Sequence, residues 1–223
     1  MEVLIMSLLE LQNVSYKNDG KTILKNISLK IESGEFISIV GPSGSGKSTF
    51  LKLCSQLISP TNGTITYRGK DFTQYNPIEL RKSIAYCFQT PCLFGNTVMD
   101  NIKFPFTIRN ISFDRKRVDQ LFSIFQMSSD FLDKDVTNLS GGEKQRIALI
   151  RCLLFKPEIL LLDEITSALD VDNTIIVEAA IDSLNKEGVT ILFVTHDFEQ
   201  SRKYAYRILT IESGEIKSLE ELK

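Results

Sequence analysis

The chain has 223 residues and a formal net charge of −2, with 24% of its residues charged and 43% hydrophobic. This length suits one large domain, or one domain with an inserted lobe. A strongly basic domain is absent, so we do not expect nucleic acid as a main partner. The four cysteines form no CxxC pair and there is one histidine, so neither a zinc site nor a disulfide framework is expected.

The first stretch, MEVLIMSLLELQ, carries an acidic residue where a signal peptide needs basic ones. No apolar run approaches the roughly 18 residues of a membrane span. We therefore expect a cytosolic chain with one domain over residues 7–223, preceded by a short lead over residues 1–6. Whether Met1 or Met6 is the native start is left open.

Strand-like segments and turns come first along the chain: LLELQNVSY, TILKNISLKI and GEFISIV. A glycine loop follows, then a helical segment, KSTFLKLCSQL, and another strand and turn, GTITYRGK. From about residue 95 to 155 the pattern changes to mostly helical. No Gly/Pro-rich linker isolates this part, so we predict a helical lobe inserted in the domain.

After the lobe the β/α alternation returns. EILLLD and VTILFVT are continuous apolar runs, typical of buried parallel strands. Between them, NTIIVEAAIDSLNKEG is predicted to form a helix that ends at Gly188. The last segment, YRILTIESGEIKSL, is predicted to form a β-hairpin. The alternation predicts an α/β fold.

The glycine loop, GPSGSGKST, fits the phosphate-binding pattern G-x-x-x-x-G-K-[ST] between an apolar strand and a helix. Its glycines allow backbone N–H groups to surround phosphates, Lys47 reaches the β and γ oxygens, and Ser48 is placed for Mg²⁺. This context indicates a nucleotide site. The loop residues are Gly41, Pro42, Ser43, Gly44, Ser45, Gly46, Lys47, Ser48 and Thr49.

Polar residues at the ends of other strands complete this site. Asp163 and Glu164 end ILLLDE, where two acids are costly unless they hold something cationic or reactive. Asp163 suits Mg²⁺, and Glu164 suits a general base that polarises the attacking water. His196 ends the next apolar strand, a position that favours contact with the γ-phosphate or Glu164. Gln89, after another strand, is a candidate for holding Mg²⁺ or the water.

A second phosphate-type helix start lies in TNLSGGEKQRIALIR. Ser140, Gly141 and Gly142 stand directly before a helical run, and a helix N-terminus of this kind receives anions. One chain therefore carries two such helix starts, roughly 90 residues apart.

Taken in order, GPSGSGKST, Gln89, LSGGEKQR, ILLLDE, SALD and FVTHD resemble the ATP-binding subunits of ABC transporters over essentially the whole chain. The resemblance implies a RecA-like P-loop NTPase core, an antiparallel β subdomain and an inserted helical subdomain. It also implies an ATPase that uses ATP and Mg²⁺ and pairs head to tail with a second copy. In such a pair the helix start at Ser140 to Gly142 caps the γ-phosphate on the partner, Asp170 crosses the interface, and Tyr16 stacks on adenine.

The resemblance further implies an integral membrane permease as partner, which would hold this chain at the cytoplasmic face of the membrane. In the family, the segment after the glutamine helps to form the groove that receives the permease's coupling helix. Here Phe94, Phe104 and Phe106 lie in that segment. Each of them fits either the groove or the core of the lobe.

Within the family, YCFQTPCLFGNTVMDNIKFPFTIRN and LLLDEITSALD look most like the bacterial Fet-type ATPases, which are associated with iron export. Iron is implied by that likeness alone. The alternatives are an ATPase of another importer or exporter (amino acid, phosphate or lipid), a soluble ABC protein acting on ribosomes or DNA, and a small-molecule P-loop kinase. A kinase would explain the glycine loop but not LSGGE or SALD.

Overall fold

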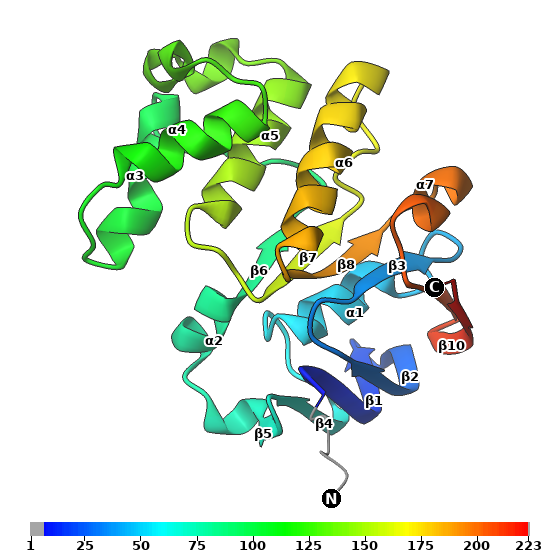
Figure 1. The fold of residues 1–223 in the computed structure, drawn as a ribbon. Helices are drawn as coiled ribbons and strands as arrows, with labels where there is room; N and C mark the ends of the chain where they lie inside the picture. The colour runs from blue at the N-terminus through cyan, green and yellow to red at the C-terminus, as the bar shows by residue number, and fades with distance from the viewer. Residues whose placement is uncertain (1–6, 223) are drawn as a thin grey trace, which may run out of the picture.

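The structure is a computed structural model that describes residues 7–222. The chain forms two β-sheets, a set of helices between and beside them, and a helical lobe at one end (Figure 1). The expected lead over residues 1–6, with both candidate start methionines, lies outside the described residues.

The smaller sheet is antiparallel, with the strand order β2-β1-β4-β5. Leu9 and Leu11 of its central strand are buried while Glu10 between them is partly exposed, so the two-residue period of the strand turns its apolar face inward. Its strands are β1 (Leu9–Asn18), β2 (Lys21–Ile31), β4 (Asn62–Tyr67) and β5 (Lys70–Asp71).

The larger sheet has the order β10-β9-β3-β8-β7-β6 and is parallel except at β10, which pairs with β9 as a hairpin. Every residue of β7 and β8 is buried, as expected where layers cover both faces. The carboxyl ends of β3, β6, β7 and β8 therefore meet at one edge, where open α/β sheets bind ligands. The strands are β3 (Phe36–Val40), β6 (Ile84–Cys87), β7 (Ile159–Asp163), β8 (Thr190–Val194), β9 (Arg207–Glu212) and β10 (Glu215–Glu221).

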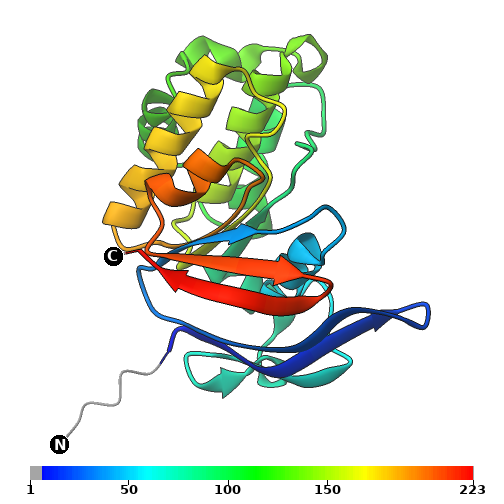
Figure 2. The ribbon, with the colours of Figure 1, turned by 90° about the vertical axis from the view of Figure 1, so that its right-hand side faces the viewer.

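Helix α1 (Lys47–Cys54) lies between the two sheets, and α6 (Val171–Lys186) and α7 (Phe198–Lys203) lie on the opposite face of the larger sheet (Figure 2). Phe50 and Leu51 of α1 are fully buried in a core that includes Leu11 of β1 and Ile39 of β3. The outer segments near the smaller sheet are α2 (Pro77–Ser83) and the 3₁₀ turn η1 (Phe72–Gln74).

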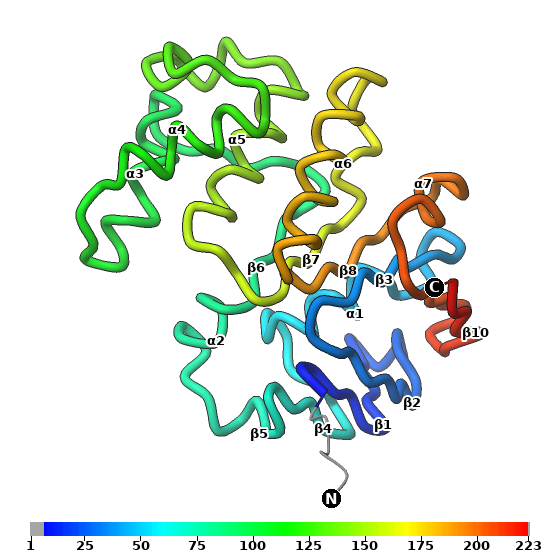
Figure 3. The backbone as a smooth tube through the Cα atoms, viewed as in Figure 1, coloured from blue at the N-terminus to red at the C-terminus, as the bar shows by residue number. Residues whose placement is uncertain are grey.

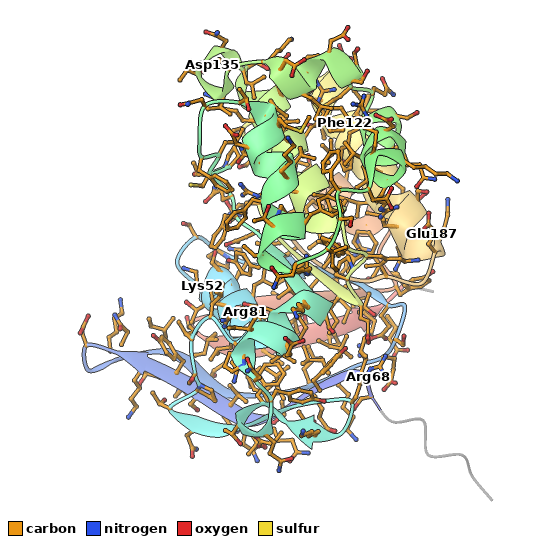
Figure 4. The ribbon with its side chains drawn as sticks, turned by 90° about the vertical axis from the view of Figure 1, so that its left-hand side faces the viewer. Lys52, Arg68, Arg81, Phe122, Asp135 and Glu187 are labelled. Carbon is orange, nitrogen blue, oxygen red and sulfur yellow. The ribbon has the colours of Figure 1, made fainter. Side chains whose placement is uncertain are left out.

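Between β6 and β7 the chain passes through the helical lobe, seen as a separate group of coils in Figure 3. Figure 4 labels Phe122 within this lobe and Asp135 at its outer end. Phe122 is 1% exposed and belongs to the same apolar cluster as Leu160 of β7 and Val177 of α6, so the lobe shares a core with the larger sheet. Its segments are α3 (Val98–Ile108), α4 (Arg115–Ile124), η2 (Ser129–Asp133), η3 (Val136–Asn138) and α5 (Gly141–Leu153).

The predicted fold class is confirmed: an α/β core, an antiparallel β subdomain and a helical subdomain all occur. Sequence analysis did not identify α2, although its start carries an N-terminal signal, since Asn76 caps it and Pro77 is its first residue. Over residues 7–222, no helix combines the length and the apolar character that crossing a membrane requires.

Candidate functional site

The phosphate loop joins β3 to α1, and its shape depends on glycine. Gly46 has a φ of 106°, and a Cβ there would lie 2.7 Å from Cδ2 of Leu24. Gly46 caps α1 without a side-chain hydrogen bond, so the first N–H groups of the helix are available to an anion. The Lys47 ammonium closes the loop by donating to the carbonyl oxygens of Gly41 and Pro42, each at 2.9 Å.

Lys47 is held in a setting that favours a negatively charged ligand. The residue is 4% exposed. Burial lowers the pKa of Lys47, while the charges of Glu164 and Asp163 act in the opposite direction. A phosphate in the loop would supply the compensating charge that a buried ammonium needs.

Each carboxylate oxygen of Asp163, the last residue of β7, accepts a hydrogen bond from a hydroxyl group. Ser48 Oγ donates to Oδ1 at 2.9 Å and Tyr86 Oη donates to Oδ2 at 2.6 Å. Burial, with the hydrogen bond to Asp163, raises the pKa of Tyr86 well above its usual value, so this phenol stays a neutral donor. Asp163 is 6% exposed, and these two bonds satisfy a carboxylate that would otherwise be costly to bury.

Glu164 points elsewhere, because the chain turns sharply after β7. Its φ of 49° is left-handed, an uncommon conformation for a side chain other than glycine and one that clusters at functional sites. The turn separates the two neighbouring acids. Glu164 Oε2 accepts from Gln89 Nε2 at 2.8 Å, and Oε1 lies 2.7 Å from His196 Nε2. Gln89 and His196 therefore fix both oxygens of this carboxylate.

These side chains surround one cavity of about 330 Å³ at the sheet edge. The structure thus brings together the phosphate loop and the residues that end three other strands. Of the predicted loop, Gly41, Pro42 and Ser45 do not line the cavity. The lining residues are Ile23, Ser43, Gly44, Gly46, Lys47, Ser48, Thr49, Gln89, Glu164 and His196.

Ser48 and Asp163 fit the ligand chemistry of Mg²⁺. The Ser48 hydroxyl and the Asp163 carboxylate are hard oxygen donors held 2.9 Å apart beside the phosphate loop, and Mg²⁺ uses few protein oxygens together with substrate phosphates and water. In residues 7–222 no group of three or more His, Cys, Asp or Glu side chains is placed to hold a metal, which is compatible with such a sparse site. Gln89 faces Glu164, and its predicted role as a metal ligand stays a prediction.

Tyr16 lies on β1 opposite Leu24, the residue whose side chain packs beside Gly46. It is half-buried against the core between the sheets. The neighbouring Ile23 lines the phosphate cavity but Tyr16 does not. Its predicted stacking on adenine therefore stays a prediction.

The second helix start lies outside this cavity. Ser140 and Glu143 form a reciprocal capping box, in which Ser140 Oγ accepts from the Glu143 N–H at 3.2 Å and Glu143 accepts from the Ser140 N–H at 2.7 Å. A Cβ added at Gly141 would meet nothing within 4 Å. None of Ser140, Gly141 and Gly142 lines the phosphate cavity. The N-termini of α1 and α5 in one chain therefore do not face the same phosphate site.

Asp170 caps α6 next to that second helix start. Its carboxylate accepts from the backbone N–H and the side-chain amide of Asn173, and these hydrogen bonds lower the pKa of Asp170. A Cβ added at Gly142 would lie 2.8 Å from the side-chain nitrogen of the same amide. The Asn173 side chain thus lies close both to Asp170 and to the start of α5, a proximity that sequence analysis missed.

Comparison with known proteins agrees with this geometry. The family model described as ABC transporter matches residues 24–167. The chain belongs to the ABC transporter family. The chain is 45% identical over 206 residues to the probable iron export ATP-binding protein FetA of Escherichia coli K12, covering 92% of this chain and 91% of that protein. It is 34% identical over 221 residues to a phosphate import ATP-binding protein, PstB 2, of Natronomonas pharaonis, covering 93% and 78%.

Solved structures of ABC cassettes are also similar. The dimeric ATP-binding cassette MJ0796 in a post-hydrolysis state with ADP and Pi has a TM-score of 0.86 and 33% identity, covering 96% of this chain and 99% of that one. The cassette cbiO1 of Clostridium perfringens has a TM-score of 0.84 and 29% identity, covering 96% and 88%. The predicted family, ABC ATPase fold and ATPase class, with ATP and Mg²⁺ as cofactors, are therefore confirmed.

Two further features of this ABC cassette were not predicted. Tyr86 belongs to the quoted segment YCFQTP, but no spacing rule points a tyrosine of one strand at the last acid of its neighbour. A polar cluster behind Glu164 and His196, centred on Gln200, also went unnoticed, because its members are scattered over three segments.

Proposed function

We propose that two copies of this ABC ATPase close head to tail around two nucleotides and so power a separate membrane permease. The observation that carries the proposal is the division of the site. One chain gathers Lys47, Ser48 and Glu164 around a cavity but places Gly141 away from it. The dimeric relative with ADP and Pi supports this arrangement.

In this scheme each side chain has a role that its contacts support. Lys47 and the loop N–H groups bind the phosphates. Ser48 and Asp163 would hold Mg²⁺, which when bound would supply positive charge to offset the charge of the phosphates. Glu164 is the general base for the attacking water, and its carboxylate oxygens, which contact Gln89 Nε2 and His196 Nε2, are held toward the cavity.

Glu164→Gln tests this assignment, because it keeps the shape of the side chain and removes the base. We expect hydrolysis to fall by about 10²-fold or more, and the variant to form an ATP-dependent dimer on size-exclusion chromatography with light scattering. Glu158→Gln is the matched control: Glu158 sits at the opposite end of β7 and pairs with Arg68 on the surface. A Glu164→Gln chain that binds ATP and Mg²⁺ at saturation yet stays monomeric would disprove the two-copy scheme.

The permease, we propose, docks in a groove between the lobe and the larger sheet. This groove has a volume of about 280 Å³. Its apolar residues include Phe88, Phe104, Ile108 and Phe155, and Phe88, Phe104 and Ile108 are exposed, which is unusual for large apolar side chains clustered at one place. Arg81, on α2 in Figure 4, lies at the same groove.

The charge of the groove supports a particular kind of partner. Its charged lining residues are all basic and no acid is among them. A membrane-protein segment with apolar side chains and one or more carboxylates would complement it. The basic lining residues are Arg81, Lys82, Arg109 and Arg151. Docked there, the chain would lie at the cytoplasmic face of the membrane.

Of the three phenylalanines predicted to lie either in the groove or in the core of the lobe, one is in the core and two are exposed. Phe106 is 3% exposed and packs on Phe113 and Phe155 in the lobe, so it is core. Phe104 is 45% exposed and lines the groove. Phe94 packs edge-on against Phe104 at 4.9 Å and remains 38% exposed. Phe94 and Phe104 thus support the docking proposal, and Phe106 supports the fold.

We propose iron as the exported cargo, on the basis of the similarity to the FetA relative. The FetA relative matches at 45% over nearly its full length, while spermidine/putrescine and phosphate importers match at 37% and 34%. The test is to isolate the tagged chain from native membranes in mild detergent and to identify its partners. A small permease without a solute-binding protein, followed by ATP-dependent Fe²⁺ transport in vesicles, is the expected result. A solute-binding protein in the complex would make it an importer.

A further inference from the structure

A buried polar cluster lies directly behind the Glu164–His196 pair. Its centre is Gln200 on α7, which is 9% exposed. Gln200 borders a hollow of about 470 Å³ that Glu164 and His196 also line. Buried polar side chains are expensive unless every hydrogen bond is made, so the partners of Gln200 are informative.

The amide oxygen of Gln200 contacts the two loops that carry the reacting residues. Thr195 donates its hydroxyl to this oxygen, and Thr166 Oγ1 lies 3.2 Å from it. Thr195 directly precedes His196, and Thr166 is on the turn that begins at Glu164. One side chain therefore ties the loop after β8 to the loop after β7, on the side away from the phosphates.

Gln200 is itself held in place from behind. Its amide nitrogen donates to Glu178 Oε1 at 2.7 Å, and Glu178 Oε2 accepts from Lys203 at 2.7 Å. Glu178 is 7% exposed on α6, and both of its oxygens are satisfied. The Gln200 amide can therefore neither rotate nor flip without leaving a buried carboxylate short of a donor.

We propose that Gln200 is a positioning residue for ATP hydrolysis, which sets the spacing of Glu164 and His196 by clamping Thr166 and Thr195 together. The inference rests on the proposed roles of Glu164 and His196. Gln200 does not contact the phosphate cavity, so its effect passes through these two loops. Small misplacements of catalytic groups cost rate steeply, while nucleotide binding depends on the phosphate loop and is spared.

The test exchanges the two partners of the central hydrogen bond. Gln200→Glu puts a second carboxylate against Glu178, and we expect kcat for Mg²⁺-ATP to fall about tenfold with the nucleotide Kd changed by less than about twofold. Adding Glu178→Gln restores a donor facing an acceptor, and the double variant should recover most of the lost kcat. Gln12→Glu is the matched control, since Gln12 Nε2 donates to Glu10 on the exposed part of β1.

The full chain is assayed for ATP turnover, for the Kd of a fluorescent ATP analogue, and for Tm. The proposal is overturned if Gln200→Glu has the kcat of the wild type, or if its nucleotide Kd rises by the same factor as its kcat falls. It is also overturned if the double variant has no higher kcat than Gln200→Glu. Should Gln200→Glu fail to fold, Thr166→Val removes one arm of the clamp at a half-buried site, and an unchanged kcat there overturns it equally. Glu164→Gln, run alongside, separates the two ideas: if it hydrolyses ATP at the wild-type rate, the proposed role of Glu164 fails instead.

Discussion

Tyr86→Phe removes one oxygen from the site, and its effect can be worked out from the bonds of Asp163. In the folded chain Tyr86 donates to Asp163 Oδ2 at 2.6 Å, and Ser48 is the donor to Oδ1. The substitution keeps the ring, which packs on Phe88 with centroids 4.6 Å apart. What is lost is one donor to a carboxylate that is 6% exposed.

A hydrogen bond to a charged group contributes about 1.5–3 kcal/mol. For a chain of this size each kcal/mol shifts Tm by about 2–4 °C, so we expect Tyr86→Phe to lower Tm by roughly 4–8 °C, for a central loss of about 2 kcal/mol. Mg²⁺ with ATP should narrow this deficit, because a cation beside Asp163 would offset the lost donor.

The measurement is thermal unfolding of the full chain with and without Mg²⁺-ATP. Tyr75→Phe is the matched control, since Tyr75 donates to the neutral carbonyl of Tyr67 at 2.9 Å, a bond that contributes about 1 kcal/mol. If Tyr86→Phe and Tyr75→Phe lower Tm equally, or if Tyr86→Phe has the Tm of the wild type, the reasoning about a buried charged acceptor is wrong.

Three further outcomes are expected. Gly141→Ala should keep the Tm of the wild type, because a Cβ there meets nothing within 4 Å, yet lose the ATP-dependent dimer seen by light scattering. Gly46→Ala should abolish binding of a fluorescent ATP analogue, since its Cβ would lie 2.7 Å from the buried side chain of Leu24. Gly44→Ala meets no atom within 4 Å and carries only the strain of a left-handed φ of 74°, so it should weaken binding less. Phe104→Asp should lose the co-purifying permease while ATP binding persists.

The phosphate loop and Asp163 could be predicted because their geometry is local. A strand, a glycine loop and a helix in succession place Lys47 and Ser48 without reference to the rest of the chain. Continuous apolar runs likewise marked β7 and β8 as buried parallel strands, so residues at their ends had to share one edge of the sheet.

The direction in which side chains point could not be predicted in the same way. Asp163 and Glu164 are adjacent in sequence, and only the left-handed turn at Glu164 sends them to different partners. The contact of Tyr86 requires β6 to lie beside β7, with Tyr86 in register with Leu161, and that pairing crosses the whole helical lobe. Strand order across such a crossover leaves no mark on local spacing.

The helical lobe illustrates the same limit on a smaller scale. Phe104 and Phe106 both occur in a phenylalanine-rich segment, and from the sequence each could lie either in the permease groove or in the core of the lobe. In α3 they are two positions apart, about 200° around the helix axis, so they cannot face the same way. Phe106 accordingly enters the core while Phe104 borders the groove.

What a second copy would add to this site can be inferred from what one copy already holds. Glu164 has a partner on each oxygen in the single chain, so dimerisation is not needed to place the base. The loop before α1 lines the phosphate cavity from one side, whereas the N-terminus of α5, with open space at Gly141, does not line it. We infer that closure supplies the second set of N–H donors to the γ-phosphate rather than the base. Gly141→Ala and Glu164→Gln should then fail differently: the first binds ATP without dimerising, and the second dimerises without turnover.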